Sequence, residues 1–138
     1  MKILLDSNVA LDYTLKREPF YADAKKIIDA ESESVEVLLS ASAVTDVYYI
    51  SRKHLGGKAL AMDSLKKLLS IVKVAAVDDA DIRRAIVLDW GDFEDAVQFV
   101  AGEGARADCV VTRDKANYAS AAIPVISPSE FINALMNA

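Results

Sequence analysis

Short apolar runs alternate along this chain with longer segments in which apolar residues recur every three or four positions. The short runs predict strands, and the three-to-four-residue period predicts helices. The predicted strands cover residues 2–6, 35–40, 71–77, 107–112 and 123–126. The predicted helices cover residues 8–15, 20–31, 42–54, 57–70, 79–89, 93–104 and 128–136. This alternation indicates an α/β protein whose mainly parallel sheet is covered by helices on both faces.

Turn-forming residues support these boundaries. Pro19, Pro124 and Pro128 all fall where an element is predicted to begin or end, which are places where a missing N–H costs least. Gly56-Gly57 separates two predicted helices and is typical of a helix C-cap. No linker, repeat or low-complexity segment interrupts the pattern, so we expect residues 1–138 to form one domain.

Composition and charge narrow the classes of protein. The chain is 53% hydrophobic and 27% charged, which is typical of a folded globular protein. No apolar run approaches the ~20 residues of a membrane span, and the chain starts in a strand without a leader, so we expect a cytoplasmic protein without membrane contact. Cys109 is the single cysteine, which excludes an intrachain disulfide and indicates a buried, inert thiol.

The net charge of −5 argues against a simple electrostatic nucleic-acid binder. If four carboxylates gather at one site, the remainder of the chain carries −5 + 4 = −1. Divalent cations bound at that site would neutralise it locally. Acidity therefore weakens the case for nucleic-acid binding without excluding it.

Asp6 is the most informative acidic residue, because it follows the apolar run Ile3-Leu4-Leu5 directly. Such a run predicts a strand buried on both faces, and ligand sites in open α/β sheets lie at the carboxyl ends of strands. Asp is also a favoured N-cap, so Asp6 is either functional or a cap of the following helix.

Two further acidic positions lie near predicted helix starts. Asp46 stands one turn into the helix that follows the second strand, where an acid also suits the helix dipole. In Asp92-Phe93-Glu94-Asp95-Ala96, Asp92 is a candidate N-cap and Asp95 lies in the first turn beside apolar neighbours. We expect Phe93, Ala96, Val97 and Val100 to form the core stripe of this helix, and Glu94 to project elsewhere into solvent.

A fourth acid, Asp114, follows the strand that ends in Val110-Val111-Thr112, where a turn cap is the ordinary explanation. Together the four acids could meet at one edge of the sheet. Carboxylates without His or Cys partners suit hard cations such as Mg²⁺ or Mn²⁺. Such ions activate water and stabilise the oxygens of an in-line phosphodiester displacement.

The ordered set of these motifs resembles the PIN-domain family of metal-dependent ribonucleases. It comprises Leu4-Leu5-Asp6-Ser7-Asn8, Ser42-Ala43-Val44-Thr45-Asp46, Asp92-Phe93-Glu94-Asp95-Ala96 and Val111-Thr112-Arg113-Asp114. The resemblance extends over essentially the whole chain. It implies an α/β/α sandwich with a five-stranded parallel sheet, and an acidic pocket that binds one or two Mg²⁺ or Mn²⁺ ions and cleaves RNA. The small size resembles the toxins of toxin–antitoxin pairs, which implies an antitoxin partner and a homodimer.

By position, the resemblance makes Asp6, Asp46 and Asp95 the core catalytic and metal-binding acids, with Asp114 as the fourth. Many members carry an acid before an aromatic residue where this chain has Asn117, which leaves the second metal position open. The hydroxyl or amide groups of Thr112, Ser7 and Asn8 are candidates to hold a carboxylate or water.

Arg113 is the preferred phosphate contact, because it follows Thr112 at the predicted mouth of the site. Tyr13 and Tyr118 are alternative candidates for base stacking.

Other families fit less well. A haloacid-dehalogenase-like phosphatase requires a second Asp where Asn8 stands, and a response-regulator receiver requires a Lys after the fifth strand. Dinucleotide binding lacks a glycine-rich turn. The alternative from another class is a PIN-like module that binds RNA or protein without turnover, with Asn117 as the cause.

Overall fold

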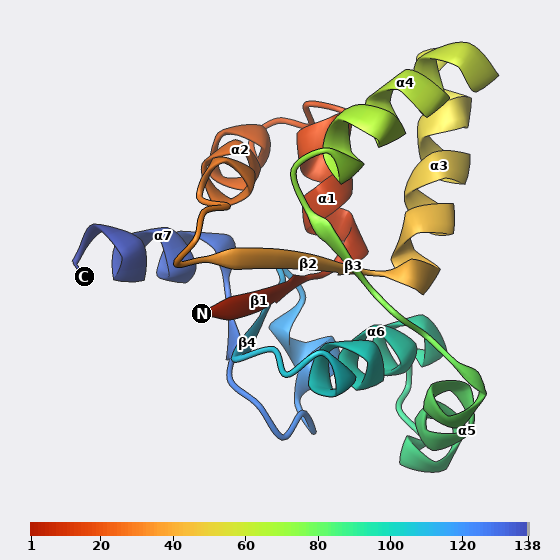
Figure 1. Ribbon diagram of the computed structural model, residues 1–138, viewed down its shortest axis with the longest axis vertical. Coiled ribbons are helices and arrows are strands. Elements are labelled where there is room, and N and C mark those ends of the chain that lie inside the picture. Colours follow the sequence, from red (N-terminus) through yellow and green to blue (C-terminus); the bar gives the residue numbers. More distant parts are fainter. Residues whose placement is uncertain (138) are drawn as a thin grey trace.

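The computed structural model describes residues 1–137, so the last residue of the predicted domain, Ala138, lies outside the described residues. Five strands and seven α-helices alternate along the chain (Figure 1). The strands are β1 (Lys2–Leu5), β2 (Glu36–Ser40), β3 (Lys73–Ala75), β4 (Cys109–Val111) and β5 (Val125–Ile126). The helices are α1 (Ser7–Thr14), α2 (Tyr21–Asp29), α3 (Ala41–Leu55), α4 (Lys58–Leu69), α5 (Asp79–Leu88), α6 (Phe93–Gly104) and α7 (Pro128–Met136).

Each predicted strand and helix is present, with boundaries that shift by at most two residues; β3 and β4 are shorter than predicted at both ends. Tertiary pairing decides where a strand ends, and only three residues of β3 find partners on β2. A short 3₁₀ helix, Lys115–Tyr118, follows β4 and was not predicted. Gly56 caps α3 in the left-handed conformation, with φ of 82°, as its sequence position predicts.

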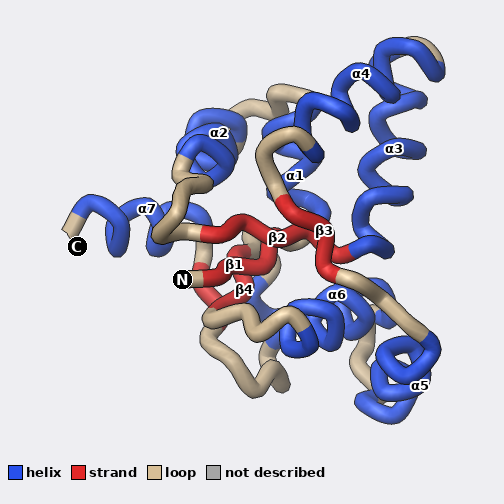
Figure 2. Tube along the Cα trace, viewed as in Figure 1, coloured by secondary structure: helices blue, strands red, loops and turns tan. Residues whose placement is uncertain are grey.

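The five strands form one parallel sheet in the order β3-β2-β1-β4-β5, of which Figure 2 labels β1 to β4. β1 is central and pairs with β2 on one side and with β4 on the other. After β1 the chain adds β2 and β3 on one side of the sheet, and it then adds β4 and β5 on the other side. The carboxyl ends of β1 and β4 therefore flank the topological switch point, where open α/β sheets form their ligand sites.

Helices cover both faces of the sheet, which confirms the three-layer α/β/α prediction (Figure 1). On one face, Ile3 and Leu5 of β1 pack with apolar residues of α1, α2, α3, α4 and α7. On the other face, Leu4 packs with residues of α5, α6 and Tyr118. Leu4 approaches α6 closely, because a Cβ built on Gly102 would lie 2.7 Å from its Cδ2 atom. No helix within residues 1–137 is long and apolar enough to cross a membrane.

Candidate active site

Asp6 lies at the carboxyl end of β1 and is only 2% exposed. It occupies the N-cap position of α1, yet its side chain makes no capping hydrogen bond to that helix. Instead its Oδ2 accepts a hydrogen bond from Thr112 Oγ1 at 2.8 Å, and its Oδ1 accepts one from Ser7 Oγ at 3.4 Å. The carboxylate therefore faces β4, while the backbone amide of Asn8 in the first turn of α1 also favours its ionised form and lowers its pKa.

Asp95 is the second buried acid of the site, 8% exposed on the first turn of α6. Burial, followed by the negative charges of Asp6 and Asp92, raises the pKa of Asp95 from 3.8 to about 7. Burial also raises the pKa of Asp6, to which the charge of Asp114 contributes. We call Asp6, Asp92, Asp95 and Asp114 the acidic cluster, because these charges act on one another.

Asp92 and Gln98 orient Asp95 from the same helix. Asp92 caps α6, and its Oδ1 accepts a hydrogen bond from the Asp95 amide at 3.0 Å, which confirms its predicted N-cap role. Gln98 is 2% exposed; its Oε1 accepts from the Ser7 amide at 2.9 Å, and its Nε2 donates to Asp95 Oδ1 at 3.5 Å. Gln98 thus connects the start of α1 to Asp95.

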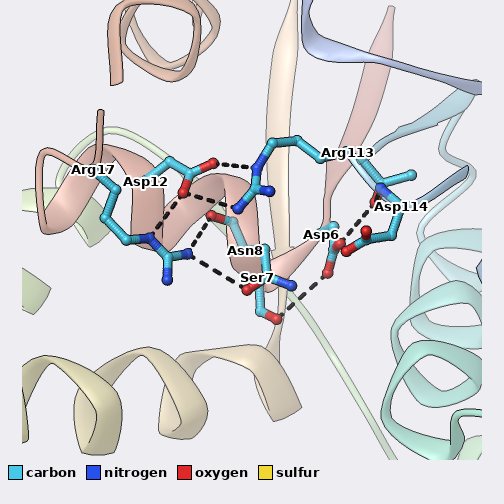
Figure 3. A network of polar contacts seen from close by, with 8 residues as sticks. Asp6, Ser7, Asn8, Asp12, Arg17, Arg113 and Asp114 are labelled. Carbon is cyan, nitrogen blue, oxygen red and sulfur yellow. Dashed lines mark hydrogen bonds and ion pairs between the residues drawn. The ribbon is translucent and has the colours of Figure 1, made fainter. Parts of the chain in front are cut away.

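Asp114 follows β4 and lies near Asp6 in Figure 3. Thr112 connects the two residues by hydrogen bonds. The Thr112 hydroxyl donates to Asp6 Oδ2 and also accepts a hydrogen bond from the Asp114 amide at 2.9 Å. Thr112 is fully buried, so this hydroxyl is held between the two acids. Its expected role in holding a carboxylate agrees with this geometry.

Asp46 and Glu94 form an outer pair of acids beside the acidic cluster. Asp46 lies on α3, and its partial burial raises its pKa. The charge of Asp46 is the largest cause that raises the pKa of Glu94, followed by burial and Asp92. Glu94 is exposed, as expected, and it lies near enough to Asp46 and Asp92 for their charges to raise its pKa. Because the charge of Asp92 also raises the pKa of Glu94, this outer pair lies next to the acidic cluster.

Asn117 and Tyr118 both donate hydrogen bonds that favour the ionised form of Asp95 and oppose its raised pKa. The Tyr118 hydroxyl lies 3.3 Å from Asp95 Oδ1 and is buried, with the side chain 1% exposed. Tyr118 is thus not available to stack on a base, and Tyr13 is 9% exposed. Phe93 is 48% exposed, so the core stripe of α6 runs through Ala96, Val97, Phe99 and Val100 instead.

The acidic cluster suits a divalent cation by chemistry and charge. Its ligands would be carboxylate oxygens, which Mg²⁺ and Mn²⁺ prefer, and burial, with neighbouring negative charges as a lesser cause, raises the pKa of Asp6 and of Asp95. However, no group of three or more acidic, His or Cys side chains within residues 1–137 is arranged closely enough to hold a metal ion. The predicted four-carboxylate centre is not preassembled, so it stays a prediction that requires side chains to turn inward.

Arg113 is engaged by a different acid from those of the acidic cluster (Figure 3). Its Nε donates to Asp12 Oδ2 at 2.8 Å, and its Nη2 donates to Asp12 Oδ1 at 3.2 Å. The guanidinium carbon lies 3.8 Å from the centroid of the Phe20 ring. A phosphate contact by Arg113 would have to compete with these partners.

Sequence reasoning missed Gln98, Asp12 and the proximity of Glu94 to Asp46. Gln98 interrupts an apolar stretch of α6 three residues after Asp95, and Asp12 interrupts an apolar stretch of α1 in the same way. A polar residue on the buried face of a helix was the available signal in both cases. Glu94 carried no such signal, because its proximity to Asp46 depends on how α3 and α6 pack.

Comparison with known proteins adds the family. A family model described as the PIN domain matches residues 2–116. The ribonuclease VapC1 of Aquifex aeolicus (strain VF5) is 28% identical to this chain, over 94% of this chain and 92% of that protein.

Two solved structures show the same fold. The first is the sarcin–ricin-loop-cleaving toxin VapC20 of Mycobacterium tuberculosis, with a TM-score of 0.69 at 15% identity, covering 86% of this chain and 94% of that one. The second is a chain of a toxin–antitoxin complex from Klebsiella pneumoniae, with a TM-score of 0.65 at 20% identity, covering 91% of this chain and 97% of that one.

Proposed function

The chain belongs to the PIN-domain family, and from this premise we propose that it is a divalent-metal-dependent ribonuclease, the toxin of a toxin–antitoxin pair. The observation that carries the proposal is the pair of buried, mutually repelling carboxylates Asp6 and Asp95 at the switch point of the sheet. Burial of two acids without a paired base costs free energy, and such cost is concentrated at functional sites.

Asp6, Asp95 and Asp114 are the residues that would hold Mg²⁺ or Mn²⁺, with Asp46 on the flank completing the set of acids. The bound ion would supply Lewis-acid stabilisation of phosphate oxygens and a more acidic water. Thr112 and Ser7 orient Asp6 through their hydroxyls, and Gln98 and Tyr118 orient Asp95.

Asp92 supports the site from the N-cap of α6, and its charge helps to keep the pKa of Asp95 high in the metal-free protein. Asn117 donates to Asp95 where many members of the family carry an acid. An amide there adds no negative charge, so we expect it to lower the affinity for a second ion. Arg17 donates to the main-chain oxygen of Asn8 at 3.2 Å, and the backbone amide of Asn8 helps to stabilise the ionised form of Asp6.

The test is cleavage of a pool of structured RNAs by the protein with Mg²⁺ or Mn²⁺, with EDTA as a control. Because one structural neighbour is named as a sarcin–ricin-loop-cleaving toxin, a ribosomal-RNA hairpin of that kind belongs in the pool. Asp6→Asn keeps the oxygen that accepts from Thr112 but removes the charge, so cleavage should fall to the level of the EDTA control.

Asp29→Asn is the matched control, since Asp29 is an exposed acid on α2 whose partner is Lys25. This variant should cleave like the wild type. Full activity of Asp6→Asn, or cleavage that persists in EDTA, would contradict the assignment.

The antitoxin is proposed from the neighbours that are toxin–antitoxin complexes, and a homodimer from the family resemblance. Co-expression with a small protein encoded beside this chain, followed by purification and an activity measurement, tests the first. Equilibrium sedimentation tests the second.

A second candidate function is a PIN-like module that binds RNA or protein without turnover. It is favoured by Asn117 and by the finding that no metal-holding group is preassembled within residues 1–137. Saturable RNA binding by folded protein that shows neither cleavage nor Mn²⁺ binding by calorimetry would support this alternative.

A further inference from the structure

Asp12 is a buried carboxylate that the proposed metal site does not use. It lies on α1, is 1% exposed, and has both oxygens occupied by arginine donors. Arg113 donates to Oδ2 from Nε at 2.8 Å and to Oδ1 from Nη2 at 3.2 Å, and Arg17 Nε donates to Oδ1 at 2.9 Å. Figure 3 shows this arrangement beside Asp6 and Asp114.

Arg113 connects Asp12 to the acidic cluster through the backbone after β4. Arg113 stands between Thr112, which donates to Asp6, and Asp114, whose amide donates to Thr112. The Arg113 guanidinium also lies against the Phe20 ring, so its position is set on two sides. A displacement of Arg113 would therefore displace Thr112 and Asp114 relative to Asp6.

Arg17 connects Asp12 to the start of the same helix. Its Nη2 donates to the main-chain oxygen of Asn8 at 3.2 Å and to Asn8 Oδ1 at 3.5 Å. Its amide donates to the main-chain oxygen of Asp12 at 3.0 Å. Asp12 thus joins the loop after α1, the first turn of α1 and the loop after β4.

We propose that Asp12 is a positioning residue for the site: acting through Arg113, it holds the segment Thr112–Asp114 beside Asp6, so that the Asp114 side chain can turn inward and share a divalent cation with Asp6. The inference rests on the proposed function, because it assumes that Asp6 and Asp114 share a cation. Arg113 is then a structural cation whose two donors are directed at Asp12, rather than a phosphate contact. A planar, two-donor contact to a buried carboxylate gives geometric specificity that a single contact lacks.

Two variants separate the contributions of the pair. Asp12→Asn keeps the shape and one acceptor but removes the charge. Arg113→Gln leaves Asp12 paired with Arg17, so it retains a partner for the buried carboxylate if Asp12→Asn fails to fold. The matched controls are Asp29→Asn and Arg83→Gln, which break exposed ion pairs with Lys25 and Asp79 on other helices.

Three measurements are made on each folded variant: Mn²⁺ affinity by calorimetry, amide hydrogen exchange of peptides covering residues 112–118, and kcat and KM for RNA. We expect Asp12→Asn and Arg113→Gln each to weaken Mn²⁺ binding by about 10- to 100-fold, as loss of a residue behind a metal ligand does. Exchange in residues 112–118 should accelerate while exchange in β1 stays unchanged. We expect kcat to fall and KM to stay within about twofold of the wild-type value, because neither substitution removes a contact to the RNA substrate.

The double variant sharpens the test. Because Arg113 acts on the site through its contact with Asp12, the double variant should bind Mn²⁺ no more weakly than Asp12→Asn alone. Additive losses would contradict action through that contact.

Other outcomes overturn the proposal. If Arg113→Gln raises KM for RNA and leaves Mn²⁺ affinity unchanged, Arg113 contacts phosphate instead. If thermal stability is the only property that both variants lose, and Mn²⁺ affinity and exchange in residues 112–118 stay at wild-type values, Asp12 has only a structural role.

Failure of the proposed function is distinguishable from failure of this inference. A wild type that cleaves no RNA still reports the effect of Asp12 on Mn²⁺ affinity and on exchange. If the wild type also binds no Mn²⁺, hydrogen exchange in residues 112–118 alone still measures the effect of Asp12.

Discussion

Replacement of Asp95 by Asn should stabilise the metal-free protein at alkaline pH but not at acidic pH. Asp95 is 8% exposed and lies near the charges of Asp6 and Asp92, and its pKa is raised from 3.8 to about 7. Its ionised form is therefore unfavourable in the folded state. Asn keeps an oxygen that accepts from Tyr118 and removes the charge.

The magnitude follows from the difference between the two ionisation constants. Raising a pKa from 3.8 to about 7 corresponds to about 4 kcal/mol, at 1.36 kcal/mol for each tenfold change. Since the folded-state pKa is the higher one, the folded protein binds more protons between these values, and its free energy of unfolding decreases as pH rises through them. The stabilisation of the folded state by proton binding at Asp95 is fully present below pH 3.8 and is lost once pH exceeds about 7. Between pH 5 and pH 8 the loss is about 3 kcal/mol.

The assay is urea unfolding followed by circular dichroism in EDTA, at pH 5 and pH 8 and constant ionic strength. The stability of Asp95→Asn relative to wild type should be about 3 kcal/mol more favourable at pH 8 than at pH 5. For a chain of this size that difference corresponds to a shift in Tm of about 10 °C. Asp29→Asn, at an exposed position, should show no such pH dependence.

Addition of Mn²⁺ should reverse the order at pH 8. A bound ion stabilises only the protein that presents ionised ligands, so the wild type gains stability and the variant gains less. Two results would refute the reasoning about the apo-protein. One is an equal effect of Asp95→Asn at both pH values, and the other is a variant less stable than wild type at pH 8 but not at pH 5.

Two further predictions concern the same helix and its neighbours. Asn117→Asp replaces a hydrogen-bond donor to Asp95 by a negative charge. It should tighten Mn²⁺ binding, measured by calorimetry at pH 8, and lower the stability of the EDTA-treated protein. Unchanged Mn²⁺ affinity would show that this position lies outside the metal shell. Gly102→Ala should destabilise the protein by about 1–2 kcal/mol in urea unfolding, because its Cβ would lie 2.7 Å from Cδ2 of the buried Leu4. Gly104→Ala, with no atom within 4 Å, should be neutral or stabilising, and equal effects of the two would contradict the packing argument.

The order of elements and the position of the main acids were open to prediction from the sequence. Buried parallel strands are continuous apolar runs, and helices on a sheet repeat every three to four residues, so local pattern alone located all five strands and all seven helices within residues 1–137. Asp6 follows such a strand directly, and Asp114 follows β4 after Thr112 and Arg113. Their place at one sheet edge follows from the parallel direction of β1 and β4.

Only the tertiary structure decided which polar groups meet. Glu94 approaches Asp46 because α6 packs beside α3, and Gln98 reaches both Ser7 and Asp95 because α6 covers the start of α1. Arg113 contacts Asp12 across 101 residues of sequence. Local patterns encode whether a side chain is buried, since burial repeats with the period of the element. Which buried polar group it contacts depends on distances between elements that are remote in the sequence, and only the packed fold sets those distances.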